Sequence, residues 1–98
     1  KGDYVIFSMS KLRNVSFNQC FLRGGGLDNC QFTNVEFEHC NLVEAELHRT
    51  SLKGIDLTSS EIAGIRIGSI PGGELKGATV TSLQALDIAR MLGITIKD

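Results

Sequence analysis

Residues 37–57 read FEHCNLVEAELHRTSLKGIDL, and a large apolar residue stands at every fifth position. The row extends in both directions, from Phe7 to Ile67, and each of its members is Leu, Phe or Ile. A second row, two residues earlier in each unit, holds small or β-branched residues. Because helical faces recur every 3.6 residues and strand faces every 2, neither element explains a period of five.

Each unit of five is interpreted as a short extended segment followed by a corner. Side chains two residues apart point the same way in an extended chain, so the small and the large row share one face. The rest of the unit must turn the chain. The last place of several units holds Asn or Gly, which suit turns: Asn14, Gly24, Asn29, Asn34, Gly54 and Gly64.

The units resemble the motif A(D/N)LXX of pentapeptide-repeat proteins, as at residues 40–44, 45–49 and 55–59, and the resemblance covers residues 5–69. It implies an all-β solenoid, a right-handed quadrilateral β-helix in which four units make one coil. Coils would then stack about 4.8 Å apart, the spacing of paired strands. Residues 20 apart would form apolar columns: Phe7-Leu27-Leu47-Ile67, Leu12-Phe32-Leu52, Phe17-Phe37-Leu57 and Leu22-Leu42-Ile62.

The register slips after Ile67. Residues 68–72 are rich in Gly and carry the single Pro, which predicts a loop. The small-x-large pattern resumes at residues 73–75 and 78–80, displaced by three, and would extend the second and third columns. We therefore expect a repeat domain over residues 1–81.

Residues 82–98 are expected to close the coil with a capping α-helix followed by a short strand. Thr81 and Gln84 fit a capping box, and Gly93 suits the position after a helix end. The predicted covering face has helical spacing: Ala85, Ile88, Ala89 and Leu92. Apolar residues off this face predict a homodimer interface: Leu83, Leu86, Met91, Ile94 and Ile96. The alternative is scattered exposed apolar residues, which are common.

The ending, with residues 73–77, 83–86 and 92–94, is similar to the C-terminus of the Qnr/MfpA branch of pentapeptide-repeat proteins. Proteins of that branch are bacterial dimers that bind DNA gyrase, imitate duplex DNA and protect the enzyme from quinolones. The resemblance implies a cytoplasmic protein with the same partner. The alternative is an interaction scaffold, truncated or engineered, without gyrase activity.

Charge supports this expectation only locally. In the projected coil an acidic stripe is predicted to meet the partner: Glu36, Glu38, Glu44, Asp56 and Glu61. The neighbouring side carries Lys11, Arg13, Lys53 and Lys76, so the formal net charge is only −1, whereas DNA mimics are strongly acidic. The alternative reading is an ordinary solvated wall. Phe21 is predicted to point outward, as an anchor for a partner or as a tolerated exposed aromatic.

No arrangement of residues predicts an enzyme, a cofactor, a metal site, or direct contact with nucleic acid or membrane. His39 and Cys40 are adjacent and would point to opposite sides of the wall, so they do not form a zinc site. The three cysteines are interpreted as small buried residues in a reducing compartment. Gly25 is expected to leave a shallow gap beneath Leu27.

Overall fold

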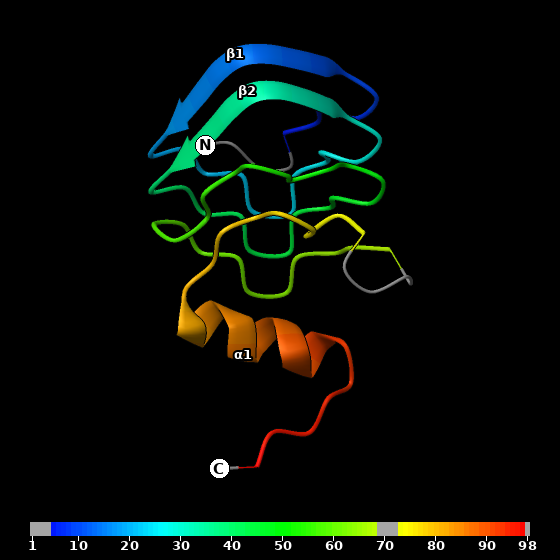
Figure 1. Ribbon diagram of the computed structural model, residues 1–98. Coiled ribbons are helices and arrows are strands. Elements are labelled where there is room, and N and C mark those ends of the chain that lie inside the picture. The colour runs from blue at the N-terminus through cyan, green and yellow to red at the C-terminus, as the bar shows by residue number, and fades with distance from the viewer. Residues whose placement is uncertain (1–4, 69–72, 98) are drawn as a thin grey trace.

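The computed structural model describes residues 5–68 and 73–97 (Figure 1). Two strands, β1 (Lys11–Asn18) and β2 (Gln31–Glu38), pair in parallel, and the helix α1 (Ser82–Met91) follows them. Lys11 pairs with Gln31 and Phe17 with Phe37, so the register joins residues 20 apart. Figure 1 shows the chain winding in stacked coils, with α1 lying across the end opposite to β1.

Single parallel bridges continue the same register on the other sides of the coil. One series joins Ile6, Gly26, Glu46 and Arg66, and a second joins Phe21, Asn41 and Glu61. Each bridge has backbone hydrogen bonds of ordinary length, such as Leu27 N–H to the Glu46 carbonyl at 2.8 Å. The predicted 20-residue repeat is thus confirmed as a β-helix-like stack.

The predicted shift of register after Ile67 is also confirmed. Asp56 bridges Thr79, which is 23 residues later, and Leu52 N–H donates to the Glu74 carbonyl at 2.9 Å. Leu75 and Val80 accordingly pack against the core as added members of their columns. Most of the predicted loop, residues 69–72, lies outside the described residues.

The corners use a left-handed backbone conformation at the last place of the unit. All six Asn and Gly residues predicted there have positive φ, for example Asn14 at 56° and Gly54 at 79°. Glu44 and Arg49 adopt the same conformation at φ of 59° and 62°. Side chains other than Gly and Asn rarely do so, and the packed stack must hold them there.

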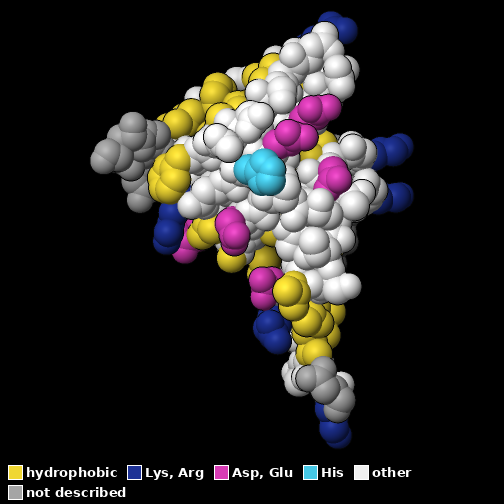
Figure 2. All heavy atoms as spheres, turned by 90° about the vertical axis from the view of Figure 1, so that its left-hand side faces the viewer, with side chains coloured by type: hydrophobic (Ala, Val, Ile, Leu, Met, Phe, Trp, Pro, Cys, Tyr) yellow, Lys and Arg dark blue, Asp and Glu magenta, His cyan; other side chains and the backbone are white. Residues whose placement is uncertain are grey.

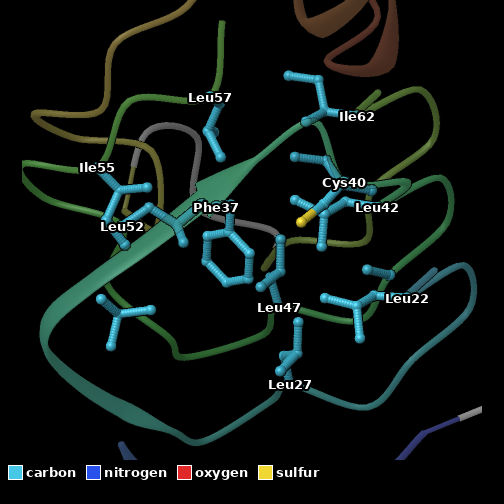
Figure 3. Packing of buried hydrophobic residues seen from close by; sticks show 13 residues of the cluster. Leu22, Leu27, Phe37, Cys40, Leu42, Leu47, Leu52, Ile55, Leu57 and Ile62 are labelled. Atoms are coloured by element: carbon cyan, nitrogen blue, oxygen red, sulfur yellow. The ribbon is translucent and has the colours of Figure 1, made fainter. Parts of the chain in front are cut away.

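Both inward rows form the core. Figure 3 shows Phe37 surrounded by leucines and isoleucines of the neighbouring coils. The Phe37 ring stacks on that of Phe17, with centroids 5.1 Å apart and planes 7° from parallel. Gly25 does not leave the expected gap. A Cβ there would lie 2.9 Å from the carbonyl oxygen of Leu22, so the glycine allows a close backbone approach.

The small inward residues connect coils through their polar atoms. Cys40 Sγ donates to the Phe17 carbonyl at 3.2 Å, and Cys40 N–H donates to Ser60 Oγ at 3.1 Å. Cys30 makes the equivalent bonds to the Phe7 carbonyl and Thr50 Oγ1. All three cysteines are free; Cys30 and Cys40 are buried as predicted, whereas Cys20 is only half-buried. They act as weak donors as well as apolar fillers.

The helix begins and ends as the sequence predicts. Thr81 Oγ1 accepts from Gln84 N–H at 3.0 Å, and Gln84 Oε1 accepts from Thr81 N–H at 2.8 Å, which completes the capping box. At the other end, Gly93 has φ of 83° and Ile94 N–H donates to the Ala89 carbonyl, as in a Schellman motif.

The predicted covering face of α1 is wrong in part. Ile88 and Met91 pack against the core, but Ala85 and Leu92 are exposed. The helix is rotated because the amide of Gln84 points at the last coil, where its Nε2 donates to the carbonyls of Leu57 and Ser60 at 2.8 Å each. A polar residue thus occupies the face on which the sequence pattern placed only apolar ones.

Candidate interaction surface

The backbone ladder is interrupted between β2 and the coil that follows it. Residues 31–38 and 51–58 stand one coil apart, yet no backbone hydrogen bond or bridge joins these two described stretches. Each is paired on its other edge, β2 with β1 and Asp56 with Thr79. Hydroxyls close the ends of the interruption: Thr50 Oγ1 accepts from Cys30 N–H, and Ser59 Oγ from His39 N–H, both at 3.0 Å.

Different corners on the two sides explain the interruption. β1 and β2 run through Asn14 and Asn34 as continuous strands, and Asn34 Nδ2 donates to Asn14 Oδ1 at 2.8 Å. The next coil forms a turn at residues 53–54, where Gly54 has no side chain to extend this ladder. Because the two backbones follow different paths, their hydrogen-bonding groups no longer face each other.

A cleft of about 380 Å³, which we call the β2 cleft, lies at this interruption. Its lining includes Val35, Phe37 and Ile55, whose side chains are buried in the core. The remaining lining residues are exposed: Glu36, Glu38, His39, Gly54, Asp56, Thr58 and Ser59. The lining includes three carboxylates and no Lys or Arg, so the local potential favours a cation.

The β2 cleft therefore brings together three of the five residues of the predicted acidic stripe. Glu36 and Asp56 are one full coil apart, as partners in a closed ladder would be. Glu44 and Glu61 lie outside the cleft lining, and Glu44 is 3.9 Å from the guanidinium of Arg23. Figure 2 shows acidic side chains near a histidine on one flank, with Lys and Arg at its edges.

Asp56 is held as an anion by its own turn. Its Oδ1 accepts from the Thr58 hydroxyl at 2.6 Å and from Thr58 N–H at 2.8 Å. These two bonds lower the pKa of Asp56 below the usual value of an aspartate. The edge of the cleft that carries Asp56 therefore stays negative at a lower pH than an ordinary aspartate would allow.

The remaining predicted contact residues lie on separate surfaces. Phe21 is exposed to 48%, so both of its readings stand. On the helix end, Leu83, Leu86 and Ile94 are exposed to 75%, 37% and 54%, whereas Met91 packs inward and Ile96 is half-buried. Residues 94–97 pair with no described strand, so the dimerisation strand stays a prediction.

Sequence reasoning missed Glu74, which is the most buried carboxylate of the described residues at 7% exposure. Its Oε2 accepts from Arg49 N–H at 3.0 Å and from Gly68 N–H at 2.9 Å, so it joins two coils. Burial acts to raise the pKa of Glu74, but the N–H donors of Arg49 and Gly68, its own backbone N–H and the charge of His48 together outweigh it, and the pKa lies below its usual value. The five-residue pattern assigns Glu74 to an outward place, so no sequence signal indicated this role.

The described part of the chain also bears on metal ligation, on the two histidines and on membrane insertion. No group of three or more His, Cys, Asp or Glu residues there could hold a metal ion. His39 and His48 are exposed, as predicted. The described helix, α1, is too short and too polar to cross a membrane.

Comparison with known proteins supports the repeat and nothing finer. No curated protein matches the chain. The match to a family model covers β2 and the residues that line the β2 cleft. That model is described as pentapeptide repeats, eight copies, and the residues that match it are 27–60.

Proposed function

We propose that the chain is a non-enzymatic binding protein. Its acidic flank, the side of the coil that carries the acidic stripe and the β2 cleft, docks on a basic surface of another protein. The observation that carries this proposal is the concentration of Glu36, Glu38 and Asp56 around one cleft in an otherwise mixed surface. A wall of short repeats offers a rigid surface for contact and needs no chemistry to do so. As proposed partner we name bacterial DNA gyrase, which the flank would engage as duplex DNA does, giving protection from quinolones.

The finer form of the fold belongs to the same proposal. Four units of five residues account for the 20-residue spacing of the bridges, which supports a four-sided coil. Right-handed winding is the hand that crossover connections between parallel strands adopt. Three free thiols suit a reducing compartment, so we propose a cytoplasmic protein.

A homodimer through the C-terminal end is a further part of the proposal. Leu83, Leu86 and Ile94 expose apolar surface at the helix end. A two-fold contact would remove that surface from water.

A supercoiling assay with gyrase tests the choice of partner. We expect this protein, at low micromolar concentration, to inhibit supercoiling or to relieve quinolone inhibition. The Glu36→Gln/Asp56→Asn variant should lose this effect, and Glu46→Gln/Asp87→Asn, with the same change of charge at exposed residues outside the stripe, should keep it. No effect of the wild-type protein at high concentration would reject gyrase as the partner.

The second candidate is an interaction scaffold with no gyrase activity. The formal net charge of −1 favours it, because duplex DNA carries dense negative charge along its whole length. In that case the acidic flank would serve a different basic protein.

A further inference from the structure

The β2 cleft offers backbone groups as well as charge. Elsewhere in the stack, the N–H of a large inward residue and the carbonyl two residues before it bond to the next coil. Leu57 N–H donates to the Thr79 carbonyl and the Ile55 carbonyl accepts from Thr79 N–H, both at 2.9 Å. The equivalent groups on β2 belong to Phe37 and Val35, and neither is bonded to the coil that follows.

The charges of the cleft oppose its closure. If residues 35–37 and 55–57 formed a ladder, Glu36 would stand directly beside Asp56. Side chains so placed are about 4.5–5.5 Å apart, and like charges there are destabilising. A cation between them would instead be attracted by both, and the lining contains no Lys or Arg of its own.

We propose that the β2 cleft binds a Lys or Arg side chain carried by an extended segment of a partner protein. The cleft volume of about 380 Å³ accommodates one long side chain. Its aliphatic stem would lie along the unpaired backbone edges of residues 35–37 and 54–56, and its cationic head would reach the carboxylates. The Val35 carbonyl, to which the following coil donates no backbone hydrogen bond, would accept from an N–H group of the same segment.

A single cationic side chain fits these observations better than a metal ion does. The described carboxylates form no metal-binding group of three, which indicates that they are spread along the rim. A guanidinium presents several donors in a planar fork and can reach separated acceptors together. The inference rests on the proposal that this flank docks on a protein, and it does not require that the protein be gyrase.

The test uses fluorescein-labelled peptides of alternating Thr with Arg, Gln or Glu, titrated with this protein at physiological salt. Fluorescence anisotropy should detect binding of the Arg peptide alone. Glu36→Gln/Asp56→Asn should weaken it about tenfold, because two charge contacts are lost. Glu46→Gln/Asp87→Asn changes the net charge equally, at exposed residues away from the cleft, and should leave the affinity within about twofold.

A second measurement does not depend on any variant. Amide chemical shifts of the wild-type protein on addition of the Arg peptide should change at residues 35–38 and 54–59 and remain constant at residues 82–92. Equal weakening by both double variants, shifts spread over the whole surface, or binding of the Gln peptide as tight as that of the Arg peptide would each overturn the site. These results are independent of the gyrase assay, so the two proposals can fail separately.

Discussion

A methyl group added at Gly25 would lie 2.9 Å from the carbonyl oxygen of Leu22 and 3.1 Å from that of Val5. Both neighbours are backbone and cannot rotate away, so Gly25→Ala must displace a coil. We expect a loss of about 2 kcal/mol in the free energy of unfolding, measured by urea denaturation. Gly54→Asn is the control, because nothing lies within 4 Å of that Cβ and Asn tolerates positive φ. Equal stability of Gly25→Ala and the wild type would contradict this packing.

The lowered pKa of Glu74 makes the free energy of unfolding depend on pH. Its pKa is lowered in the folded state, so the carboxylate stabilises the fold above the usual pKa of a glutamate. This contribution is lost as the pH falls from that value through the folded pKa. Glu74→Gln should therefore be less stable than the wild type at pH 7, by about 1–3 kcal/mol, and the difference should shrink in acid.

Urea denaturation at several pH values measures the effect of Glu74→Gln. Glu46→Gln serves as the matched control, since Glu46 is exposed. A stability gap that is constant or grows on acidification would show that Glu74 is not an ionised link between coils.

Besides the apolar contacts of Ile88 and Met91, one side chain with two functions attaches the C-terminal helix to the coil. Gln84 uses its oxygen for the capping box and its Nε2 for the carbonyls of Leu57 and Ser60. Gln84→Glu keeps an acceptor for the cap but replaces the donor with a carboxylate beside two carbonyl oxygens. We expect a loss of about 2 kcal/mol and faster hydrogen exchange in residues 82–91. Thr81→Ser, which keeps the cap hydroxyl, should exchange like the wild type. Unchanged exchange in Gln84→Glu would show that apolar packing alone holds the helix.

An element could be predicted from the sequence where residues close together in the chain determine it, and could not where contacts between distant residues do. The coil register, the shift by three residues before Leu75 and the limits of the helix all follow from side-chain periodicity and capping residues, which the sequence displays directly. The rotation of α1 could not be predicted in this way, because Gln84 meets its carbonyl partners only after the chain has folded. Glu74 was missed for the same reason: its partners come from another coil and from beyond the loop.

The cleft arises because two successive coils have different backbone paths. The five-residue pattern does not describe how one coil differs from the next. Asn34 and Gly54 both suit a corner, and the pattern treats them alike. Yet Asn34 lies within a strand, whereas Gly54 lies in a turn. The acidic stripe was predicted by projection onto a regular coil, so the carboxylates could be assigned to one flank but the opening between them could not.

The oligomeric state of the whole molecule can be tested at the exposed helix surface. Leu86→Arg places a charge on the exposed surface of the helix, which also carries Leu83, and Leu86 does not belong to the core. We expect it to weaken the proposed dimer at least tenfold, seen by light scattering over a range of concentrations, with an unchanged unfolding transition. Thr33→Arg, on the exposed wall of β2, should leave the mass unchanged. A monomeric wild-type protein, or a dimer of equal affinity in Leu86→Arg, would remove this interface.

The interrupted ladder also has a mechanical consequence. A tension applied along the stacking axis is shared, side by side, by the backbone bonds between successive coils. Between β2 and residues 51–58 those bonds are replaced by the Thr50 and Ser59 hydroxyls at the two ends. This seam carries the load on fewer contacts than its neighbours do. Under force the stack should part there first, into an N-terminal piece built on β1 and β2 and a C-terminal piece held by the helix.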